Sequence, residues 1–496
     1  MKEPVLAKPP LLAEGIVTVD KMGEIPLPEQ IYRAIRDAVR SAVLRPGTKL
    51  PSTRRLAAVL DVSRNTVNAA YGLLLAEGIV SVRPGSAPRI TEDLPPEGAS
   101  VSLSGSPAAP LLSRRGETMA ANLRGRGWGH RFGAFQPGAP ALDCFPYEEW
   151  ARCLRRAARL ERGADLLYRN FAGVPELQKQ LAAHLAVERG VHAEPEQILI
   201  TSSMQSSLTL VSQALADAGD SAWLEEPGYV GARTAFHMAG LSIHPLPVDG
   251  EGADIAKMPA AAAAPRLIYV TPSHQFPLGA RMPLARRLAL LEAARTGGAV
   301  ILEDDYDSEF LFSGRPVAAL FGLAEEGQVI YLSTFSKSLL PGMRVAYCVV
   351  PPALVEPLAQ AVRNFGCAAN VQAQAALASF MDSGGYRKHL KNIRQIYQAR
   401  GSLLVETLKE RLGNSIEVDR PTGNVQLALT FRQPRDDVAL ALEMHERGFA
   451  VSPLSSYYIG SEKRSGLVVG FAGATEKQIA QGVEALGDLL ANKRAG

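Results

Sequence analysis

The fold is decided by the stretch Tyr331-Leu-Ser-Thr-Phe-Ser-Lys-Ser-Leu-Leu-Pro-Gly-Met-Arg344, which continues an apolar, strand-like segment. Its lysine, Lys337, carries an amine that can bond an aldehyde covalently when the amine is uncharged and the aldehyde is held beside it. The hydroxyls of Thr334 and Ser336 and the guanidinium of Arg344 offer the donors and the fixed positive charge that a phosphate needs. The stretch therefore indicates a ligand with an aldehyde and a phosphate, although a surface lysine after a strand would look the same.

A second stretch narrows the choice to pyridoxal 5′-phosphate. The apolar run Ala299-Val-Ile-Leu302 leads into Glu303-Asp-Asp-Tyr306. This cofactor works as an electron sink only when a carboxylate keeps its ring nitrogen protonated, and a tyrosine hydroxyl can bond its ring oxygen. Open α/β sheets bind ligands at the carboxyl ends of parallel strands. Tyr306 and Lys337 are 31 residues apart, which is enough for one crossover connection to bring two strand ends together.

Four motifs resemble fold-type I aminotransferases: EEPGY (Glu225–Tyr229), TPSHQFPLG (Thr271–Gly279), EDDYDSEF (Glu303–Phe310) and STFSKSLLPGMR (Ser333–Arg344). More narrowly, they resemble the MocR/GabR group of GntR-type transcriptional regulators, in which a winged helix is joined to an aminotransferase-like domain. The resemblance covers nearly the whole chain. It implies an α/β fold class with a mainly parallel sheet and a smaller C-terminal subdomain, pyridoxal 5′-phosphate as the cofactor, and a head-to-tail homodimer.

The resemblance also assigns roles to residues around the cofactor. Asp304 would pair with the pyridine nitrogen, Tyr306 with the ring hydroxyl, and Tyr229 would stack on the ring. A loop between a strand and a helix N-terminus favours an anion, which suits the phosphate. The other contacts implied are the backbone amides of Ser203, Met204 and Gln205 for the phosphate, Gln275 beside His274 near the ring oxygen, and Tyr168, reaching the phosphate of the partner subunit.

Length and composition bound the class of protein. At 496 residues the chain is too long for one ordinary core, so two or three domains are expected. Hydrophobic residues make up 47% of it, which excludes wholesale disorder, and the net charge of +3 is too small to indicate nucleic acid by itself. The four cysteines show no C-x-x-C spacing, and no signal peptide or membrane-spanning stretch is visible. We therefore expect a cytoplasmic protein without a metal site.

Residues 26–91 are expected to form a winged helix-turn-helix after an extended leader over residues 1–25. Apolar residues recur at helical spacing, and serines precede two of the expected helices as caps. The expected elements are a helix from Leu27 to Leu44 that Arg45-Pro-Gly47 stops, a helix Thr53–Leu60 capped by Ser52, a third helix that Ser63 caps and that runs through Glu77 with Ser63–Leu75 as recognition helix, and a two-stranded wing between Ile79 and Ile90.

Local charge indicates that this module binds DNA rather than being a plain helical subdomain. From Leu27 to Thr91 there are ten basic and four acidic residues, a net charge of about +6 in a chain whose total is +3. The segment Gly47–Ala57 also resembles the GntR winged-helix signature. This resemblance implies that Arg54, Arg64 and Thr66 lie at helix N-termini facing phosphates or base edges and that Arg83 lies on the wing. The side-chain donors of Arg64, Asn65, Thr66 and Asn68 suit base edges in the major groove.

The rest of the chain divides into a linker and one large domain. Residues 92–131 are rich in Pro, Gly, Ser and Ala without a hydrophobic period, which is typical of a linker. Residues 132–496 form the expected aminotransferase-like domain. It opens with the helix Tyr147–Leu160 and continues as apolar strands that alternate with helices, which predicts a mainly parallel sheet.

The identity of the effector depends on an arginine that the sequence lacks at the expected place. Aminotransferases hold the substrate α-carboxylate with an arginine near the C-terminus, but the late strand Gly466–Phe471 contains none. Arg464 and Arg432 would substitute only if the local backbone redirects them. We therefore expect a regulator that senses an amine without an α-carboxylate, or pyridoxal 5′-phosphate itself, with very slow transamination. A working aminotransferase with an attached DNA-binding module, and a structural fold whose lysine has lost its role, are the alternatives.

Overall fold

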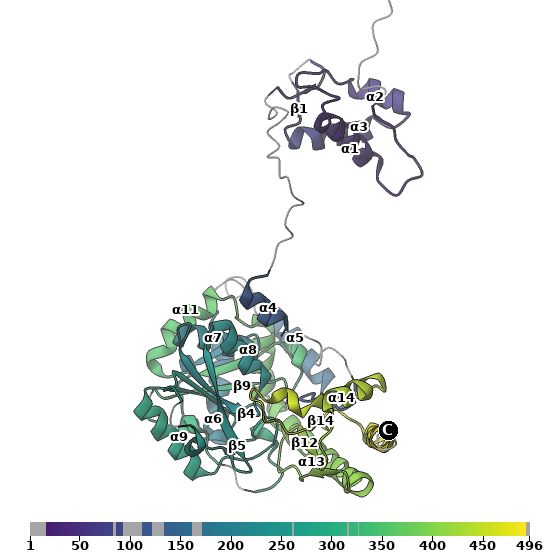
Figure 1. Cartoon of the computed structure of the whole chain (residues 1–496). Helices are drawn as coiled ribbons and strands as arrows, with labels where there is room; N and C mark the ends of the chain where they lie inside the picture. Colours follow the sequence, from purple (N-terminus) through teal and green to yellow (C-terminus); the bar gives the residue numbers. More distant parts are fainter. Residues whose placement is uncertain are drawn as a thin grey trace, which may run out of the picture. The chain divides into compact units, whose positions relative to one another are not determined.

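The computed structural model describes residues 16–82, 86–92, 112–121, 133–160, 171–259, 262–314, 317–325 and 327–492. The chain divides into two compact units, Met1–Leu111 and Leu112–Gly496, and each has its own hydrophobic core (Figure 1). Two of the predicted binding residues, Arg83 and Tyr168, lie outside the described residues, as does most of the expected linker.

The N-terminal unit is a winged helix-turn-helix, as the sequence predicted. Leu56 and Val67, on the two helices of the helix-turn-helix, are fully buried together with Ile31 and Ile35 of the first helix. Its elements are α1 (Leu27–Arg40), α2 (Thr53–Leu60), α3 (Arg64–Ala76) and the antiparallel wing strands β1 (Val80–Ser81) and β2 (Arg89–Ile90).

Both predicted helix caps of this unit are confirmed. The Ser52 hydroxyl accepts a hydrogen bond from the backbone N–H of Arg55, and the Ser63 hydroxyl accepts one from the N–H of Thr66. Between the two helices Asp61 adopts a left-handed conformation with φ of 52°, which makes the turn tight. Each cap satisfies a donor that the first helical turn would otherwise leave unpaired.

The first helix is shorter than predicted. α1 ends at Arg40 because Ala42 turns left-handed, with φ of 56°, instead of continuing the helix. The turn carries Leu44 into the core, where its backbone N–H donates to the carbonyl of Ala38. Part of the expected leader also packs on this unit, since Val17 is buried in the same core. Helical spacing alone could not reveal the early stop, because the residues after it are apolar too.

The second unit is built on an eight-stranded sheet with the order β3-β10-β9-β8-β7-β4-β5-β6. β5, β4, β7, β8 and β9 run parallel, so the prediction of a mainly parallel sheet is confirmed. β10 lies antiparallel between β3 and β9, and β6 is antiparallel to β5 at the edge. The strands are β3 (Ile198–Thr201), β4 (Ser221–Glu226), β5 (Ser242–Asp249), β6 (Gly252–Ala253), β7 (Leu267–Val270), β8 (Val300–Asp304), β9 (Val329–Thr334) and β10 (Ala346–Val349).

Helices cover both faces of this sheet, because alternate strand residues point to opposite sides. Leu302 and Leu332 pack with α7, α8 and α11 on one face, whereas Ile301 packs with α9 and Tyr331 with α6 on the other (Figure 1). The helices of these layers and of the opening segment are α5 (Tyr147–Leu160), α6 (Pro175–Arg189), α7 (Met204–Leu215), α8 (Val230–Ala239), α9 (Leu284–Gly297), α10 (Leu320–Leu323), α11 (Val355–Asn364) and α12 (Val371–Asp382).

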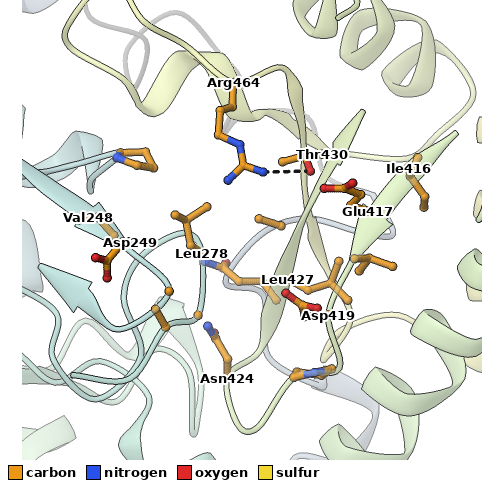
Figure 2. A pocket seen from close by; sticks show the side chains of 18 of the residues that line it. Val248, Asp249, Leu278, Ile416, Glu417, Asp419, Asn424, Leu427, Thr430 and Arg464 are labelled. Atoms are coloured by element: carbon orange, nitrogen blue, oxygen red, sulfur yellow. Dashed lines mark hydrogen bonds between the residues drawn. The ribbon is translucent and has the colours of Figure 1, made fainter. Parts of the chain in front are cut away.

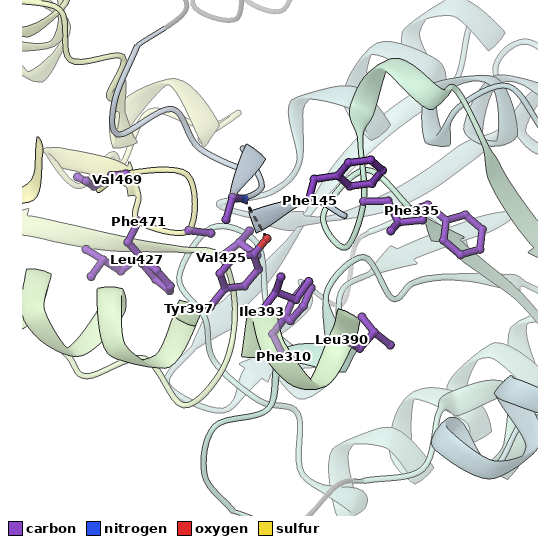
Figure 3. Close-up of a cluster of buried hydrophobic side chains, with 14 of the residues drawn as sticks. Phe145, Phe310, Phe335, Leu390, Ile393, Tyr397, Val425, Leu427, Val469 and Phe471 are labelled. Atoms are coloured by element: carbon purple, nitrogen blue, oxygen red, sulfur yellow. Dashed lines mark hydrogen bonds between the residues drawn. The ribbon is translucent and has the colours of Figure 1, made fainter. Parts of the chain in front are cut away.

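The smaller C-terminal subdomain has an antiparallel sheet with the order β11-β12-β14-β13. Its elements are α13 (Gly385–Leu412), β11 (Ile416–Val418), β12 (Gln426–Phe431), α14 (Asp437–Glu446), β13 (Ser452–Pro453), β14 (Gly466–Gly470) and α15 (Glu476–Asn492). Figure 3 shows how Phe471, Leu427 and Tyr397 join this sheet and α13 in one apolar cluster. Tyr397 also accepts a hydrogen bond from the N–H of Ala141 and donates to the carbonyl of Lys337, which fixes the loop that carries the lysine.

Some elements were not expected from the sequence. β10 begins at Ala346, two residues after Arg344, and was not among the predicted strands. A short helix, α4 (Arg114–Ala121), lies inside the expected linker and has no buried residue. Within the part of the chain that the structure describes, no helix has the length and apolarity needed to cross a membrane.

Candidate functional site

The ends of β8 and β9 place the acidic motif and the lysine side by side. The two strands are parallel neighbours, and Asp304 is paired in register with Leu332 of β9. Asp304 is the last residue of β8, and Lys337 lies in the loop that follows the end of β9 at Thr334. The two residues therefore lie at the carboxyl ends of neighbouring strands. The predicted crossover between Tyr306 and Lys337 thus brings the two motifs to one edge of the sheet, where α/β proteins bind ligands.

Asp304 is a buried carboxylate with one oxygen left unpaired. The hydroxyl of Tyr269, on β7, donates to Oδ2 at 2.6 Å, whereas Oδ1 has no hydrogen-bond partner among the described residues. Burial raises the pKa of Asp304 to about 7, although Tyr269 and the nearby Lys337 amine both lower it. A protonated ring nitrogen against Oδ1 would supply the missing partner and restore the charge of the carboxylate.

Tyr306 presents a second unpaired group next to the first. Its hydroxyl is buried and has no hydrogen-bond partner in the described part of the chain, and the same holds for the amide nitrogen of Asn424. Burial raises the pKa of Tyr306 well above its usual value, while the side chain of Asn424 acts in the opposite direction. Tyr306 and Asn424 together can therefore bind one ring oxygen, and the sequence did not single out Asn424.

Lys337 lies against a glycine that makes room for it. Its Nζ donates to the carbonyl of Gly138 at 3.0 Å. Gly138 has φ of 74°, and a Cβ there would come within 2.3 Å of the lysine nitrogen. Any side chain at this position would push the amine out of place, so Gly138 is a positioning residue that sequence reasoning missed. Its signal was the Gln136-Pro-Gly turn.

Hydroxyl groups gather at the expected phosphate end. Ser203 caps α7, and its hydroxyl accepts from the N–H of Ser206 and lies 2.9 Å from that residue's hydroxyl. Across the sheet edge, the backbone N–H of Ser336 donates to the hydroxyl of Thr334 at 3.2 Å. The Arg344 side chain is exposed, and its guanidinium makes no hydrogen bond or ion pair with a described residue, whereas its backbone N–H donates to the carbonyl of Pro341. A helix N-terminus, four hydroxyls and this guanidinium form a suitable donor set for a phosphate.

Two predicted neighbours of the phosphate differ in what they offer. Met204, the first residue of α7, is buried and can contribute only its backbone amide, as expected. The side chain of Gln205 donates to the carbonyl of Gly231 at 3.2 Å, so it links α7 to the start of α8.

Tyr229 is the predicted stacking residue and forms one wall of the site. Its ring stacks on Tyr269 at 6.5 Å between centroids and meets the edge of Phe276 at 5.4 Å. The ring also lies directly over Gly231, where a Cβ would approach to 2.4 Å. Tyr229 therefore has the aromatic surroundings and the glycine clearance that a ring-stacking role requires.

Gln275, the predicted neighbour of the ring oxygen, is hydrogen-bonded within its own surroundings in this structure. Its amide nitrogen donates to Pro227 O at 2.8 Å and to Phe276 O at 2.7 Å, and its Oε1 accepts from Leu278 N at 3.1 Å. These bonds fix the loop after β7 and use the polar capacity of the side chain. The amide nitrogen of Asn424, in contrast, has no hydrogen-bond partner among the described residues.

The other acids of the motif have partners of their own, as strand alternation predicted. Glu303 accepts from the backbone N–H groups of Leu320 and Phe321, and Asp305 is paired with Arg189 at 2.7 Å. Burial raises the pKa of Glu303 to about 7, but Arg189 and neighbouring hydroxyls outweigh burial at Asp305 and lower its pKa. Asp305 Oδ1 is also unpaired, but its other oxygen holds Arg189, so Asp304 is the one carboxylate of the three that neither backbone amides nor an arginine holds.

These observations fit pyridoxal 5′-phosphate. The unpaired Oδ1 of Asp304 and the hydroxyl of Tyr306 match the ring nitrogen and the ring oxygen, and the donor cluster at Ser203 and Ser336 matches the phosphate. Lys337 provides the amine between them. Within the described residues no group of three or more His, Cys, Asp or Glu side chains could hold a metal ion.

The carboxylate arginine of aminotransferases has no equivalent on the late strand. β14 presents Val468, which is fully buried beside Leu454 and Tyr457 in an apolar cluster. Arg432 also lines the cavity, where it is paired with Glu417 at 2.9 Å. β14 thus carries no arginine, as the sequence indicated, and the exposed Arg464 lies just before this strand among the residues that line the cavity.

The predicted DNA-reading residues cluster on the helix-turn-helix. Arg54, Arg64, Asn65 and Asn68 are exposed near the start of α2 and α3, where a duplex could reach them. Arg64 Nε lies 3.4 Å from the Thr53 hydroxyl, which links the starts of the two helices. Of the other two predicted contacts, Thr66 is half-buried and hydrogen-bonded to Ser63 at 2.8 Å, whereas Arg83 lies outside the described residues.

The raised pKa of Asp304 gives a testable dependence of stability on pH. In the cofactor-free protein the folded pKa of Asp304 is about 7, whereas its unfolded pKa is about 4, so the fold favours the neutral acid. The stability that the neutral acid contributes is complete below about pH 4 and is lost as pH rises to about 7. Asp304→Asn mimics the neutral acid and removes this loss. As pH rises from 4.5 to 7.5, we expect the free energy of unfolding of wild type to fall by roughly 2–4 kcal/mol relative to that of the variant.

Urea unfolding of the cofactor-free protein at several pH values measures this difference. The neighbouring variant Asp305→Asn is the control, because it breaks the ion pair with Arg189 and should destabilise the protein throughout this range. A constant difference between wild type and Asp304→Asn across the range would show that Asp304 is ionised in the fold.

Comparison with known proteins agrees with the two units. Residues 27–90 match the model of the bacterial regulatory proteins of the gntR family. Residues 139–486 match the model of class I and II aminotransferases. The first match covers the winged helix-turn-helix, and the second covers the sheet, its helices and the smaller subdomain.

Individual relatives share both parts. The chain is 38% identical over 472 residues to the probable rhizopine catabolism regulatory protein MocR of Rhizobium meliloti, with 95% of each chain covered. It is 30% identical over 471 residues to the pyridoxine biosynthesis transcriptional regulator PdxR of Corynebacterium glutamicum, with 94% of this chain and 96% of that protein covered. Among solved structures, the α-aminoadipate aminotransferase LysN of Thermus thermophilus has a TM-score of 0.70 at 28% identity, covering 76% of this chain and 97% of that chain.

Proposed function

We propose a function that follows from the family, because this chain belongs to the MocR group of GntR-type transcriptional regulators. The protein binds pyridoxal 5′-phosphate at Lys337, and recognition of an amine there is coupled to operator binding by the winged helix. The observation that carries the proposal is the set of buried, unpaired polar atoms on Asp304 and Tyr306 beside Lys337. Unpaired buried polar groups cost free energy, so a site that keeps them is built for a ligand that pairs them.

The residues around Lys337 each have a part in holding the cofactor. Asp304 keeps the ring nitrogen protonated, Tyr306 and Asn424 hold the ring oxygen, and Tyr229 stacks on the ring. The bound cofactor supplies an aldehyde that links to an amine and a ring that withdraws electrons. The phosphate donors are the amides of Ser203, Met204 and Gln205, the hydroxyls of Thr334 and Ser336, Arg344, and Tyr168 across the dimer interface.

The N-terminal unit would read double-stranded operator DNA as part of a head-to-tail homodimer. Arg64, Asn65 and Asn68 are exposed on the recognition helix, which supports contact with base edges, and Arg54 supports contact with phosphates. A dimer would place two such helices on two half-sites. A role on DNA places the protein in the cytoplasm.

Sensing is favoured over catalysis by the apolar surface at the substrate's end of the site. An α-carboxylate would meet Val468 and its apolar neighbours, where an aminotransferase places an arginine. A carboxylate without a charged partner in such surroundings is strongly disfavoured. An ordinary α-amino acid would therefore be held weakly, and turnover would be slow.

The test is a titration of the full-length protein with duplex DNA from its own upstream region. Fluorescence anisotropy would be recorded with and without pyridoxal 5′-phosphate and candidate amines. We expect specific binding whose affinity changes several-fold when an amine occupies the site in the wild type, but not in Lys337→Ala. Specific binding that no amine alters, together with rapid turnover of an α-amino acid and a keto acid, would overturn the regulator in favour of an aminotransferase.

A further inference from the structure

The cavity beside the cofactor site continues outward between the large domain and the smaller subdomain. It has a volume of about 1360 Å³ and is bordered by Asp249 and Leu278 on one side and by β12 on the other (Figure 2). Asn424 lies at its inner end and Arg464 at its mouth. This volume exceeds what the side chain of a small amino acid fills, so the cavity can take a longer molecule.

One face of β12 forms a continuous wall along this cavity. Gln426, Ala428 and Thr430 alternate along the strand and line the cavity together with Leu427, while Leu429 and Phe431 are buried in the core. The wall therefore changes in character from the inner end to the mouth: an amide, then a methyl group, then a hydroxyl. The four residue steps from Gln426 to Thr430 span roughly 13 Å.

Gln426 gives the inner end an unused hydrogen-bonding group. Its side chain is 1% exposed, and both its amide nitrogen and its oxygen have no hydrogen-bond partner among the described residues. Its Oε1 and the Nζ of Lys337 both lie within 4 Å of the position that a Cβ on residue 138 would take. A ligand amine next to Lys337 would thus find an amide able to accept from it and to donate to a neighbouring group.

The middle of the cavity is apolar. Leu278, Leu427 and Ala428 line it, and Leu278 and Ala428 pack against a buried apolar cluster that contains Val468 and Tyr457. The part of a ligand that crosses it gains free energy only if it is hydrocarbon, and a charge placed here would be desolvated without a partner.

The mouth carries a positive charge that is available for a ligand. Arg464 is exposed, points into the cavity in Figure 2, and donates to the hydroxyl of Thr430 at 3.4 Å. It makes no ion pair with any described residue, whereas Arg432 on the same side is paired with Glu417 at 2.9 Å. A planar guanidinium next to a hydroxyl matches a carboxylate or another oxyanion.

We propose that the effector is an extended amine with its amino group between Lys337 and Gln426, a hydrocarbon middle against Leu278 and Ala428, and an anionic group at Arg464. This inference rests on the proposed function, because the amine is placed next to the cofactor-binding lysine. The molecule would be on the order of 10 Å long, as the length of the β12 wall requires. It is therefore longer than an α-amino acid, and its anion is remote from its amine.

The test uses a series of ω-amino acids, from 4-aminobutyrate through 6-aminohexanoate to 8-aminooctanoate, with octylamine as a probe that lacks the anion. Isothermal calorimetry on the cofactor-loaded protein should show affinity rising with chain length. Arg464→Ala should weaken 8-aminooctanoate about tenfold and leave octylamine unchanged. Arg432→Ala, on the same side of the cavity but already paired, should leave both unchanged.

Several outcomes would overturn the inference while the proposed function stands. Equal affinity for short and long amino acids, or equal loss of 8-aminooctanoate in both arginine variants, would remove Arg464 from the site. Gln426→Leu should weaken every amine but not cofactor loading, measured by absorbance, and unchanged amine binding in this variant would also contradict the proposal. If wild-type protein takes up no pyridoxal 5′-phosphate at all, the proposed function itself fails.

Discussion

Replacing Lys337 by alanine is expected to abolish the covalent attachment of pyridoxal 5′-phosphate to the protein. Lys337 Nζ is held at 3.0 Å from the carbonyl of Gly138, beside the carboxylate of Asp304, and it is the amine that this pocket brings to the cofactor. The phosphate donors around Ser203 and Ser336 are untouched, so weak, non-covalent binding should remain. Borohydride reduction followed by peptide mass spectrometry should label the wild type at residue 337 and leave the variant unlabelled.

The matched control is Lys463→Ala, which removes a lysine that lines the large cavity shared by Asn424 and Gln426. This variant should keep the full near-ultraviolet and visible absorbance of the bound cofactor. Labelling of any lysine other than Lys337 in the wild type would contradict the assignment. Loss of label in Lys463→Ala with Lys337 intact would do the same.

The parallel strands of the large domain could be predicted because each is a short apolar run that both faces of the sheet bury. β3, β4, β7, β8 and β9 form where such runs occur. β5 was missed because prolines and a histidine interrupt its sequence, Ser242-Ile-His-Pro-Leu-Pro-Val-Asp249. Its parallel pairing with β4 stabilises it in spite of weak strand propensity, which is a tertiary effect that no local pattern contains.

The site was predictable where its residues sit in motifs at strand ends, and not where they come from the other subdomain. Asp304, Tyr306 and Lys337 lie at or just after the ends of apolar runs, and such runs can be recognised in the sequence as buried strands. Asn424 and Gln426 belong to a turn and a strand more than a hundred residues away from Asp304. Nothing near them in the chain shows that the smaller subdomain folds back onto the sheet edge. Their roles depend on packing between subdomains, which only coordinates reveal.

Gln275 shows the limit of reading a role from position in a motif. Its place after His274 indicated a contact with the ring oxygen, but its amide is used to hold the loop around Pro227 and Leu278. A buried amide has few hydrogen bonds to give, and the backbone groups of its own loop are nearest. Residue type and spacing gave no sign of this competition.

Replacing Arg64 by alanine is expected to weaken binding to the specific operator by roughly 1–3 kcal/mol while changing binding to random duplex much less. Arg64 is the first residue of the recognition helix α3, and its side chain is exposed, with Nε at 3.4 Å from the Thr53 hydroxyl. An exposed guanidinium at this end of a recognition helix can bond the two acceptors of a guanine edge. The Ser63 cap does not involve the Arg64 side chain, so the fold should remain intact.

Anisotropy titrations against operator and scrambled duplexes, each at several salt concentrations, separate base reading from phosphate binding. A base-reading arginine should lower operator affinity with little change in the slope of log K against log salt, because few counterions are involved. Arg33→Ala is the control, since Arg33 lies on α1 and is paired with Glu29. Equal losses on both duplexes with a shallower salt slope would make Arg64 a phosphate contact. No effect on either duplex would remove it from the interface, and α3 would then have to read DNA through Asn65 and Asn68, which are exposed beside it.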